Sequence, residues 1–360
     1  MMMMTRRAGL AAVLALGLGA AGSAFAAEPL KVGFVYVGPI GDYGYSHQHN
    51  EGRLAVEKHF GDKVKTTYVE NVPEGADAER VIRQLAQTGH QLIFTTSFGF
   101  MNPTAKVAKQ FPKVKFEHAT GYLRGPNLAT YMARFYEGRY AAGVAAGRLT
   151  KSNKLGYIAS FPIPEVVRGA NAFTLGAKSV NPKAEVRVVW VNSWYDPGKE
   201  REAAEALIAQ GVDVISQHTD SAAPVQAADE KGVWAIGQAS DMSRFGPRSH
   251  LTAIVDDWSG YYIARVQAVM DGTWKSTDTW RGFDAGMVRL APFNPAVPAA
   301  VKAEALKVED EIKTHKLHPF TGPIKDQSGK ERVAPGKVMA DADLLKMNWF
   351  VQGVIGDMPK

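Results

Sequence analysis

The chain has 360 residues, of which 46% are hydrophobic and 22% are charged, and it contains no cysteine. This composition is typical of a globular protein, and the lack of cysteine excludes disulfides, a thiolate nucleophile and a cysteine-ligated metal. Without Arg6 and Arg7, 40 basic and 36 acidic side chains remain, and this net charge of +4 does not indicate a nucleic-acid-binding protein.

The first 26 residues have the features of a signal peptide. Arg6 and Arg7 precede an apolar run over residues 9–20, and Ala24 to Ala26 follow with the small residues that a signal peptidase recognises. We therefore expect cleavage after Ala26 and export to the periplasm. A membrane anchor is the alternative, but spanning a bilayer takes about 20 apolar residues. Because no cysteine is available for lipid attachment, we expect a free monomer that is not membrane-anchored.

Strand-like and helix-like patterns alternate along the first part of the mature chain. Strands are predicted at residues 31–37, 64–69, 91–95, 113–118 and 128–132, and helices at 49–60, 76–87 and 104–110. Such an order favours a parallel sheet covered by helices on both faces.

The same alternation then begins again. Strands are predicted at 154–160, 185–191, 212–217, 233–237, 251–255 and 284–290, helices at 166–180, 198–210, 223–231, 258–270 and 301–314, and a turn-rich hairpin at 319–331. The sequence therefore predicts an α/β fold with two Rossmann-like lobes. We assign residues 27–132 and about 255–283 to lobe 1, and residues 133–254 and about 284–360 to lobe 2.

Ligands of open α/β sheets bind beyond the carboxyl ends of the strands, so the loops at these ends are the candidate site. In lobe 1, the loop at residues 38–47 contains Asp42, Tyr43, Tyr45 and Ser46 among three glycines. The loop at residues 96–103 supplies Phe98, Gly99, Phe100 and Asn102. The alternatives are an ordinary surface loop for the first and packing beneath a neighbouring loop for the second.

Lobe 2 and the segment after it supply further candidates at strand ends. They are Trp194, Asp220, Gln238, Asp241, Asp257 and Trp258. Tyr45 and Trp194 are predicted to hold a flat ring between them, since aromatic faces stack on planar bases. The aspartates would accept hydrogen bonds from amino groups and ring N–H groups of a ligand.

Motifs of catalysis and of metal binding are missing. His47 and His49 are two residues apart, and neither HxxxH, GxSxG, a Walker motif nor GxGxxG opening a helix is present. We therefore expect a binding protein with no cofactor and no metal rather than an enzyme. A periplasmic nucleoside hydrolase that uses aspartates as acid and base is the alternative from another class.

Four segments resemble the basic-membrane-protein (BMP) family of ABC-transporter solute-binding proteins, whose characterised members bind purine nucleosides. They are Asp42–Ser46, Tyr136–Gly143, Ser193–Lys199 and Gly237–Asp241, in the family's order. The resemblance implies a type I periplasmic binding protein with crossover hinges, and a permease and an ATPase as partners.

By position, the resemblance makes Tyr45 and Trp194 the stacking pair. It also implies that Asp42 and Asn102 contact the base and that Asp241 lies near the family's ribose site.

The segment near the expected hinge departs from the family. Where nucleoside binders commonly carry a lysine that helps to hold the sugar, this chain has Asp256 and Asp257, followed by Trp258. Ser46 and Ala239 also replace the family's asparagine and aspartate. We therefore expect a free purine base, adenine first, with a purine nucleoside or a sugar as the alternative ligands.

Overall fold

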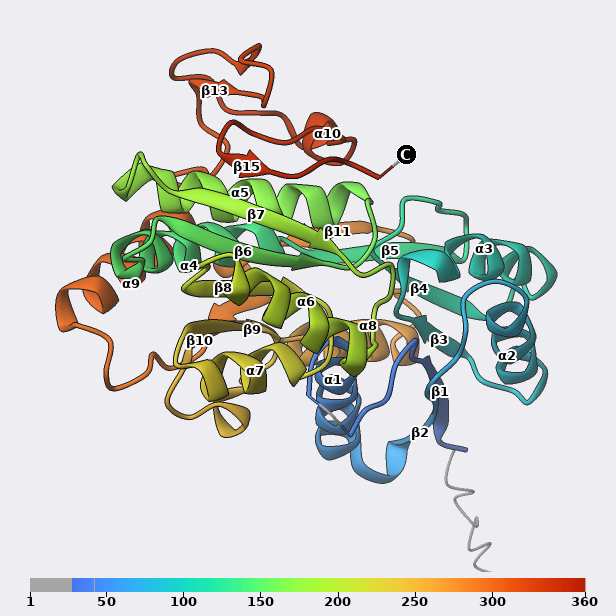
Figure 1. Ribbon diagram of the computed structural model, residues 1–360. Helices are drawn as coiled ribbons and strands as arrows, with labels where there is room; N and C mark the ends of the chain where they lie inside the picture. Colours follow the sequence, from blue (N-terminus) through green and yellow to red (C-terminus); the bar gives the residue numbers. More distant parts are fainter. Residues whose placement is uncertain (1–27, 42, 360) are drawn as a thin grey trace, which may run out of the picture.

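The computed structural model describes residues 28–41 and 43–359. The predicted signal peptide and Asp42 lie outside these residues. The chain forms two α/β lobes with mainly parallel sheets, which confirms the predicted fold class (Figure 1).

Lobe 1 is built on a six-stranded parallel sheet in the order β11-β5-β4-β3-β1-β2. Its strands are β1 (Leu30–Val35), β2 (Val64–Val69), β3 (Leu92–Thr95), β4 (Lys115–Ala119), β5 (Leu128–Ala133) and β11 (Asp278–Arg281). Its helices are α1 (Tyr45–Phe60), α2 (Ala76–Gln87), α3 (Met101–Gln110) and α8 (Ser259–Met270), with the 3₁₀ turns η1 (Gly61–Lys63) and η2 (Phe98–Phe100).

Alternation along the strands gives lobe 1 a core on each face of its sheet. In β3, Leu92 and Phe94 join the apolar cluster that includes Val56 of α1, whereas Ile93 joins the cluster that includes Ile82 of α2. Successive side chains of a strand point to opposite faces, so the unbroken apolar run is what a strand covered on both sides requires.

Lobe 2 is built on a seven-stranded sheet in the order β12-β10-β9-β8-β6-β7-β15, in which β12 is antiparallel to β10. Its strands are β6 (Lys154–Ala159), β7 (Glu185–Trp190), β8 (Val214–His218), β9 (Trp234–Ala239), β10 (His250–Asp256), β12 (Val288–Leu290) and β15 (Val354–Ile355). Its helices are α4 (Phe135–Leu149), α5 (Pro164–Val180), α6 (Pro197–Ala209), α7 (Ala223–Lys231) and α9 (Ala299–Lys313), with η3 (Ser243–Phe245) and η4 (Phe283–Ala285).

Helices α4 and α5 pack at very short range. A Cβ on Gly143 would meet the carbonyl oxygen of Phe173, and a Cβ on Gly176 would meet that of Tyr140. Gly143 of the Tyr136–Gly143 segment therefore serves helix packing, because only a residue without a side chain lets the two backbones approach so closely.

The chain crosses between the sheets three times, from β5 to α4, from β10 to α8 and from β11 to β12. Strand β11 was not predicted, and the strand predicted at 284–290 was too long. Its first residues form η4, and Gly286 follows with φ 70°, a left-handed conformation that ends the turn before β12 begins.

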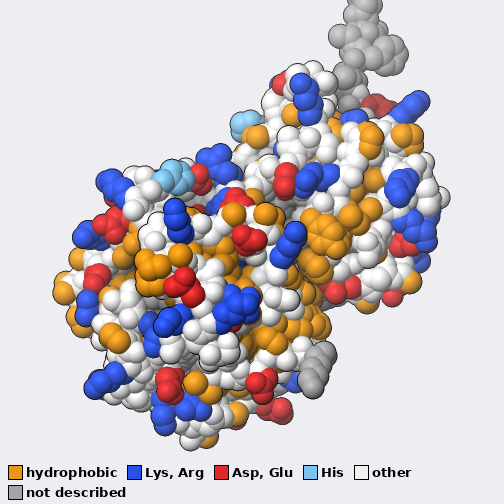
Figure 2. Space-filling model, turned by 90° about the horizontal axis from the view of Figure 1, so that it is seen from above, with side chains coloured by type: hydrophobic (Ala, Val, Ile, Leu, Met, Phe, Trp, Pro, Cys, Tyr) orange, Lys and Arg blue, Asp and Glu red, His pale blue; other side chains and the backbone are white. Residues whose placement is uncertain are grey.

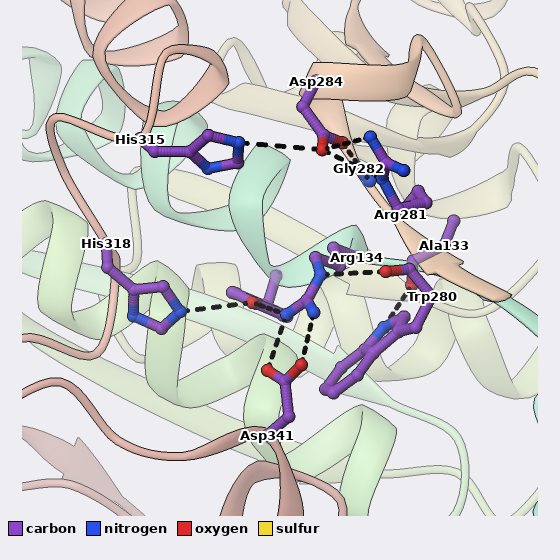
Figure 3. A network of polar contacts seen from close by, with 10 residues as sticks. Ala133, Arg134, Trp280, Arg281, Gly282, Asp284, His315, His318 and Asp341 are labelled. Carbon is purple, nitrogen blue, oxygen red and sulfur yellow. Dashed lines mark hydrogen bonds and ion pairs between the residues drawn. The ribbon is translucent and has the colours of Figure 1, made fainter. Parts of the chain in front are cut away.

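The C-terminal segment, residues 314–359, lies over α5 (Figure 1). It contains the short strands β13 (Ile324–Lys325) and β14 (Glu331–Val333), helix α10 (Asp341–Leu344) and strand β15, which extends the sheet beside β7. Arg168 of α5 donates to the carbonyl oxygen of Leu344 at 2.7 Å. Figure 3 shows a second contact that holds the C-terminal segment. Arg134, between β5 and α4, donates to both carboxylate oxygens of Asp341 at 2.8 and 2.5 Å.

Trp258 lies at the junction of the two lobes and is fully buried. Its ring stacks on His49 with centroids 4.5 Å apart and meets Tyr131 and Phe135 edge-on. Across the part of the chain that the structure describes, no helix combines the length and the apolar character needed to span a membrane.

Candidate functional site

A cavity lies where the carboxyl ends of the strands of both lobes meet. It encloses about 360 Å³ of space between atoms, part of which is open to solvent. Lobe 1 supplies Val37, Tyr45, Ser97, Phe98 and Thr120, and lobe 2 supplies Glu165, Trp194, His218, Asp220 and Gln238. Most of these residues lie at the end of a strand or in the loop that follows it, whereas Tyr45 and Glu165 lie in the first turns of α1 and α5.

The lobes touch beside this cavity. The indole Nε1 of Trp194 donates to Glu74 at 3.2 Å, and the backbone N–H of Tyr45 donates to Asp220 at 3.1 Å. The N–H of Gly44 donates to Ser240 at 2.5 Å. Each bond joins one lobe to the other, so the cavity is a site between lobes held together at its rim.

Several buried polar atoms at the cavity have no hydrogen-bond partner among the described residues. The hydroxyl of Tyr45 and Oε2 of Glu165 belong to residues that line the cavity. Both carboxyl oxygens of Asp256 and Nε1 of Trp258 belong to residues close to Tyr45 that do not line it. An unsatisfied buried polar atom costs about 1–3 kcal/mol, and native proteins keep few of them. Their convergence on one cavity identifies it as the place where a polar ligand would be held.

Burial changes the charge of this site. It raises the pKa of Asp220 to about 8, with a further rise from nearby Glu200, and it raises the pKa of fully buried Asp256 well above its ordinary value. Burial also lowers the pKa of His218, which leaves the imidazole neutral at pH 7. Asp220 is therefore largely protonated at neutral pH and can donate as well as accept hydrogen bonds, and burial shifts the pKa of Asp256 in the same direction.

Arg139 is the buried cation beside these groups. It extends from α4 and donates to Ser216 at 3.1 Å and to Gln238, which lines the cavity. Its charge favours the ionised form of Asp256, against the larger effect of burial. Because the amide oxygen of Gln238 accepts this hydrogen bond from Arg139, the amide NH₂ of Gln238 is the group left to donate to a ligand.

The predicted pair Asp256–Asp257 does not act as a unit. Asp256 faces the interior beside the cavity, whereas Asp257 lines a separate groove and accepts from the N–H of Ser259 at 2.9 Å. Tyr43 and Asp241 line that same groove and not the cavity. Tyr43, Asp241 and Asp257 therefore lie in a groove apart from the cavity that Tyr45 lines, and their contact with the ligand stays a prediction.

Phe100 and Asn102 also lie away from the cavity. Phe100 is fully buried in the core of lobe 1, and Asn102 is exposed on α3. Helix α3 begins at Met101 rather than at Thr104, so Asn102 is helical and its side chain points to solvent. Trp258 lies behind the cavity, where its ring meets that of Tyr45 edge-on at 6.4 Å.

Two other predicted residues shape the site without lining it. The hydroxyl of Ser46 accepts from the N–H of Gly38 at 3.1 Å and holds the first loop. Gly99 donates to the carboxylate of Glu74 at 3.0 Å, and a side chain at this position would collide with that carboxylate. Glu74 in turn receives the indole N–H of Trp194. Asp42, the remaining candidate, lies outside the described residues.

The sequence did not indicate Glu165, which lines the cavity with one unpartnered oxygen and has the other 3.5 Å from Nε2 of His218. An acidic residue in the first turn of a helix is usual because it complements the helix dipole, so nothing set Glu165 apart. Within residues 28–41 and 43–359, no group of three or more His, Asp or Glu side chains could hold a metal ion.

Comparison with known proteins finds relatives over nearly the whole chain. Residues 30–326 match the family described as "ABC transporter substrate-binding protein PnrA-like". A purine-binding protein of Brucella abortus (strain 2308) is 56% identical over 94% of this chain and 97% of its own. A protein of Haloferax volcanii that carries the name of an ABC transporter glucose-binding protein is 40% identical, over 92% and 82% of the two chains.

A solved solute-binding protein of an ABC transporter system from Aeropyrum pernix K1 has the same fold. It superposes with a TM-score of 0.70 over 84% of this chain and 95% of its own, at 17% identity.

Proposed function

The chain belongs to the family of PnrA-like ABC transporter substrate-binding proteins, and on that premise we propose that it is the periplasmic receptor for a free purine base, adenine first. Members of this family are binding proteins rather than enzymes, and they deliver a small molecule to a transporter. Membership of this family therefore speaks against the alternative of a periplasmic nucleoside hydrolase.

The observation that carries the proposal is the set of unpartnered polar atoms around a cavity with aromatic walls. Phe98 and Trp194 offer ring faces, and Tyr45, Glu165 and Asp256 offer hydrogen-bonding atoms with no partner among the described residues. A purine is flat and carries both N–H donors and ring-nitrogen acceptors on its edge. Protonated Asp220 or Asp256 could donate to such a nitrogen, while Glu165 could accept from an amino group. The Brucella relative, named for purine binding, supports the same ligand class.

The preference for a base over a nucleoside rests on what surrounds the cavity. Arg139, the buried cation beside the cavity, uses both terminal nitrogens to donate to Ser216 and Gln238, which leaves only its Nε without a partner. Trp258 and His49 fill the space behind Tyr45. These contacts support the argument that first rested on Asp256 and Asp257, of which only Asp256 faces the site.

A sugar is the second candidate. The Haloferax relative is named for glucose binding, and aromatic rings with nearby carboxyl groups also suit sugar hydroxyls. A purine fits better here because burial keeps Asp220 largely protonated and Asp256 strongly favours the neutral form, whereas ionised carboxylates are the stronger acceptors for hydroxyl groups.

We propose the processing, the location, the partners and the lobe boundaries of the protein on the same basis. The mature protein would begin after Ala26, move freely in the periplasm as a monomer and dock on a permease driven by an ATPase. Its lobes would comprise residues 27–132 with about 255–283, and residues 133–254 with about 284–360. Closure of the lobes would add the rim contacts of Gly44 and Trp194 to those made with the ligand.

Titration calorimetry with the mature protein tests the ligand. Adenine, adenosine, guanosine, ribose and glucose would be compared under one condition, and native mass spectrometry would identify any molecule retained through purification. We expect adenine to bind with 1:1 stoichiometry and at least tenfold more tightly than adenosine. Tight binding of nucleosides with no heat from free bases would overturn the preference for a base, and binding of glucose alone would overturn the purine.

A further inference from the structure

A mainly apolar channel lies beside the cavity, on the side of the C-terminal segment. Phe98, Thr120 and Glu165 line both the cavity and the channel. The channel encloses about 1140 Å³ of space between atoms, part of which is open to solvent. The cavity and the channel are therefore neighbours that meet at these three side chains, and a substituent of a ligand in the cavity would enter the channel past them.

The outer part of this channel is built from three segments. Tyr122 comes from lobe 1, Ile163 from lobe 2 and Leu345 from the end of α10. Tyr122 and Leu345 are 64% and 41% exposed, although both side chains are large and apolar over most of their surface. Figure 2 views the molecule from the side of the C-terminal segment and shows hydrophobic side chains gathered between the charged ones on this face. Exposed apolar side chains that share one groove are typical of a binding surface.

The C-terminal wall is held in place by buried and paired groups. Asp341, at the start of α10, receives two hydrogen bonds from Arg134, and these bonds hold the pKa of its carboxyl below the ordinary value (Figure 3). Arg168, which also lines the channel, binds the carbonyl of Leu344. Leu345 is thus the next residue after a fixed turn of helix rather than part of a loose tail.

This wall lies beyond residue 326, where the match to the family ends. The cavity itself is built from residues within the matched range. The channel therefore combines a cavity inside the range of the family match with a wall outside it.

We propose that the site accepts purines that carry an apolar substituent of several carbons on a nitrogen, with the base in the cavity and the substituent between Tyr122 and Leu345. The proposal rests on the purine site proposed above. The charged side chains that line the channel, Glu165, Arg168 and Lys346, are of both signs and so favour no net charge on a substituent. An apolar substituent instead removes the channel walls from water.

Calorimetry with adenine, N6-benzyladenine and 9-benzyladenine tests this proposal in three proteins. They are the wild type, Leu345→Gln, and Leu306→Gln as a matched control, because Leu306 is 42% exposed on α9 and lines neither cavity nor channel. We expect at least one benzyl isomer to bind as tightly as adenine or more tightly. Leu345→Gln should weaken that isomer about threefold to tenfold, in proportion to the apolar area lost, and leave adenine within about twofold.

Two results would overturn the proposal. One is that adenine binds while both benzyl isomers bind about a hundredfold more weakly. The other is that Leu345→Gln and Leu306→Gln change the affinity for the benzyl isomers equally. If neither adenine nor a benzyl isomer binds, the purine site itself fails and the channel proposal falls with it.

Discussion

Replacing Gly44 by alanine tests whether contact between the lobes is part of ligand binding. Gly44 has φ 100° and ψ −161°, and a Cβ there would lie 3.1 Å from the carbonyl carbon of Asp220 and closer still to its oxygen. That carbonyl is backbone of the other lobe and cannot rotate away. The clash is therefore relieved only by moving the lobes apart, and such overpacking costs about 1–3 kcal/mol.

The clash and the backbone strain have different signatures. Strain at a glycine-like φ acts whether or not the lobes touch, costs about 1–3 kcal/mol and lowers the Tm. The clash acts only when the lobes touch, so Gly44→Ala should weaken adenine binding about tenfold to a hundredfold. Gly41→Ala is the control, since it lies in the same loop and its Cβ would meet no atom within 4 Å. Equal adenine affinities of the two variants in calorimetry would refute this reasoning.

Three further substitutions address the cavity itself. Trp194→Ala should weaken adenine about tenfold to a hundredfold, because a stacked ring contributes about 1–3 kcal/mol, and Trp194→Phe should recover most of this; unchanged calorimetric affinity in Trp194→Ala would count against stacking. Asp220 has an ordinary pKa of 3.8 and a folded pKa of about 8, so the folded state binds an extra proton between these values and the free energy of unfolding falls as pH rises. Between pH 6 and pH 8, the free energy of unfolding measured in urea should fall by on the order of 1–2 kcal/mol less in Asp220→Asn than in the wild type. An equal fall in the two proteins would contradict the raised pKa of Asp220. Arg139→Met should lower the free energy of unfolding by about 3 kcal/mol, since it leaves buried Asp256 and Gln238 without their cation; a urea midpoint like that of the wild type would argue against this role.

The strand-end rule accounts for what the sequence predicted well. Phe98, Trp194, Asp220 and Gln238 come from four different strand ends, and parallel sheets bring such ends to one edge. Hydrophobic runs and turn residues were sufficient to place most of these strands within one or two residues. Tyr45 was found as a bulky residue in a glycine-rich loop, although α1 begins one turn earlier than expected.

The direction in which individual side chains point could not be predicted from the sequence. Asp256 and Asp257 are neighbours at the end of β10, and consecutive residues of a strand point to opposite faces, so only one of them could face the cavity. Which one depends on the register of β10 against β9 and β12, and this register is set by contacts distant in the chain. The sequence also did not show that Phe100 ends the 3₁₀ turn η2, directly before α3, where its side chain is buried in the core of lobe 1.

The role of Arg139 could not be predicted from the sequence either. It lies in a helix rich in glycine and alanine, where the sequence shows only that a charged residue interrupts a small-residue surface. Its partners Ser216 and Gln238 come from β8 and β9, which are distant in sequence. The sequence also could not show that α10 forms a wall of the channel, since Arg134 and Arg168, which are distant in the chain, hold α10 in place.

A crystal structure of the mature protein grown with adenine would test the central claim most directly. The account predicts one adenine between the lobes, with its ring against Tyr45 or Trp194 and with Glu165, Asp220 or Asp256 within hydrogen-bonding distance of its edge. Adenine bound instead in the groove of Tyr43, Asp241 and Asp257, or a sugar retained in the cavity in preference to adenine, would contradict it.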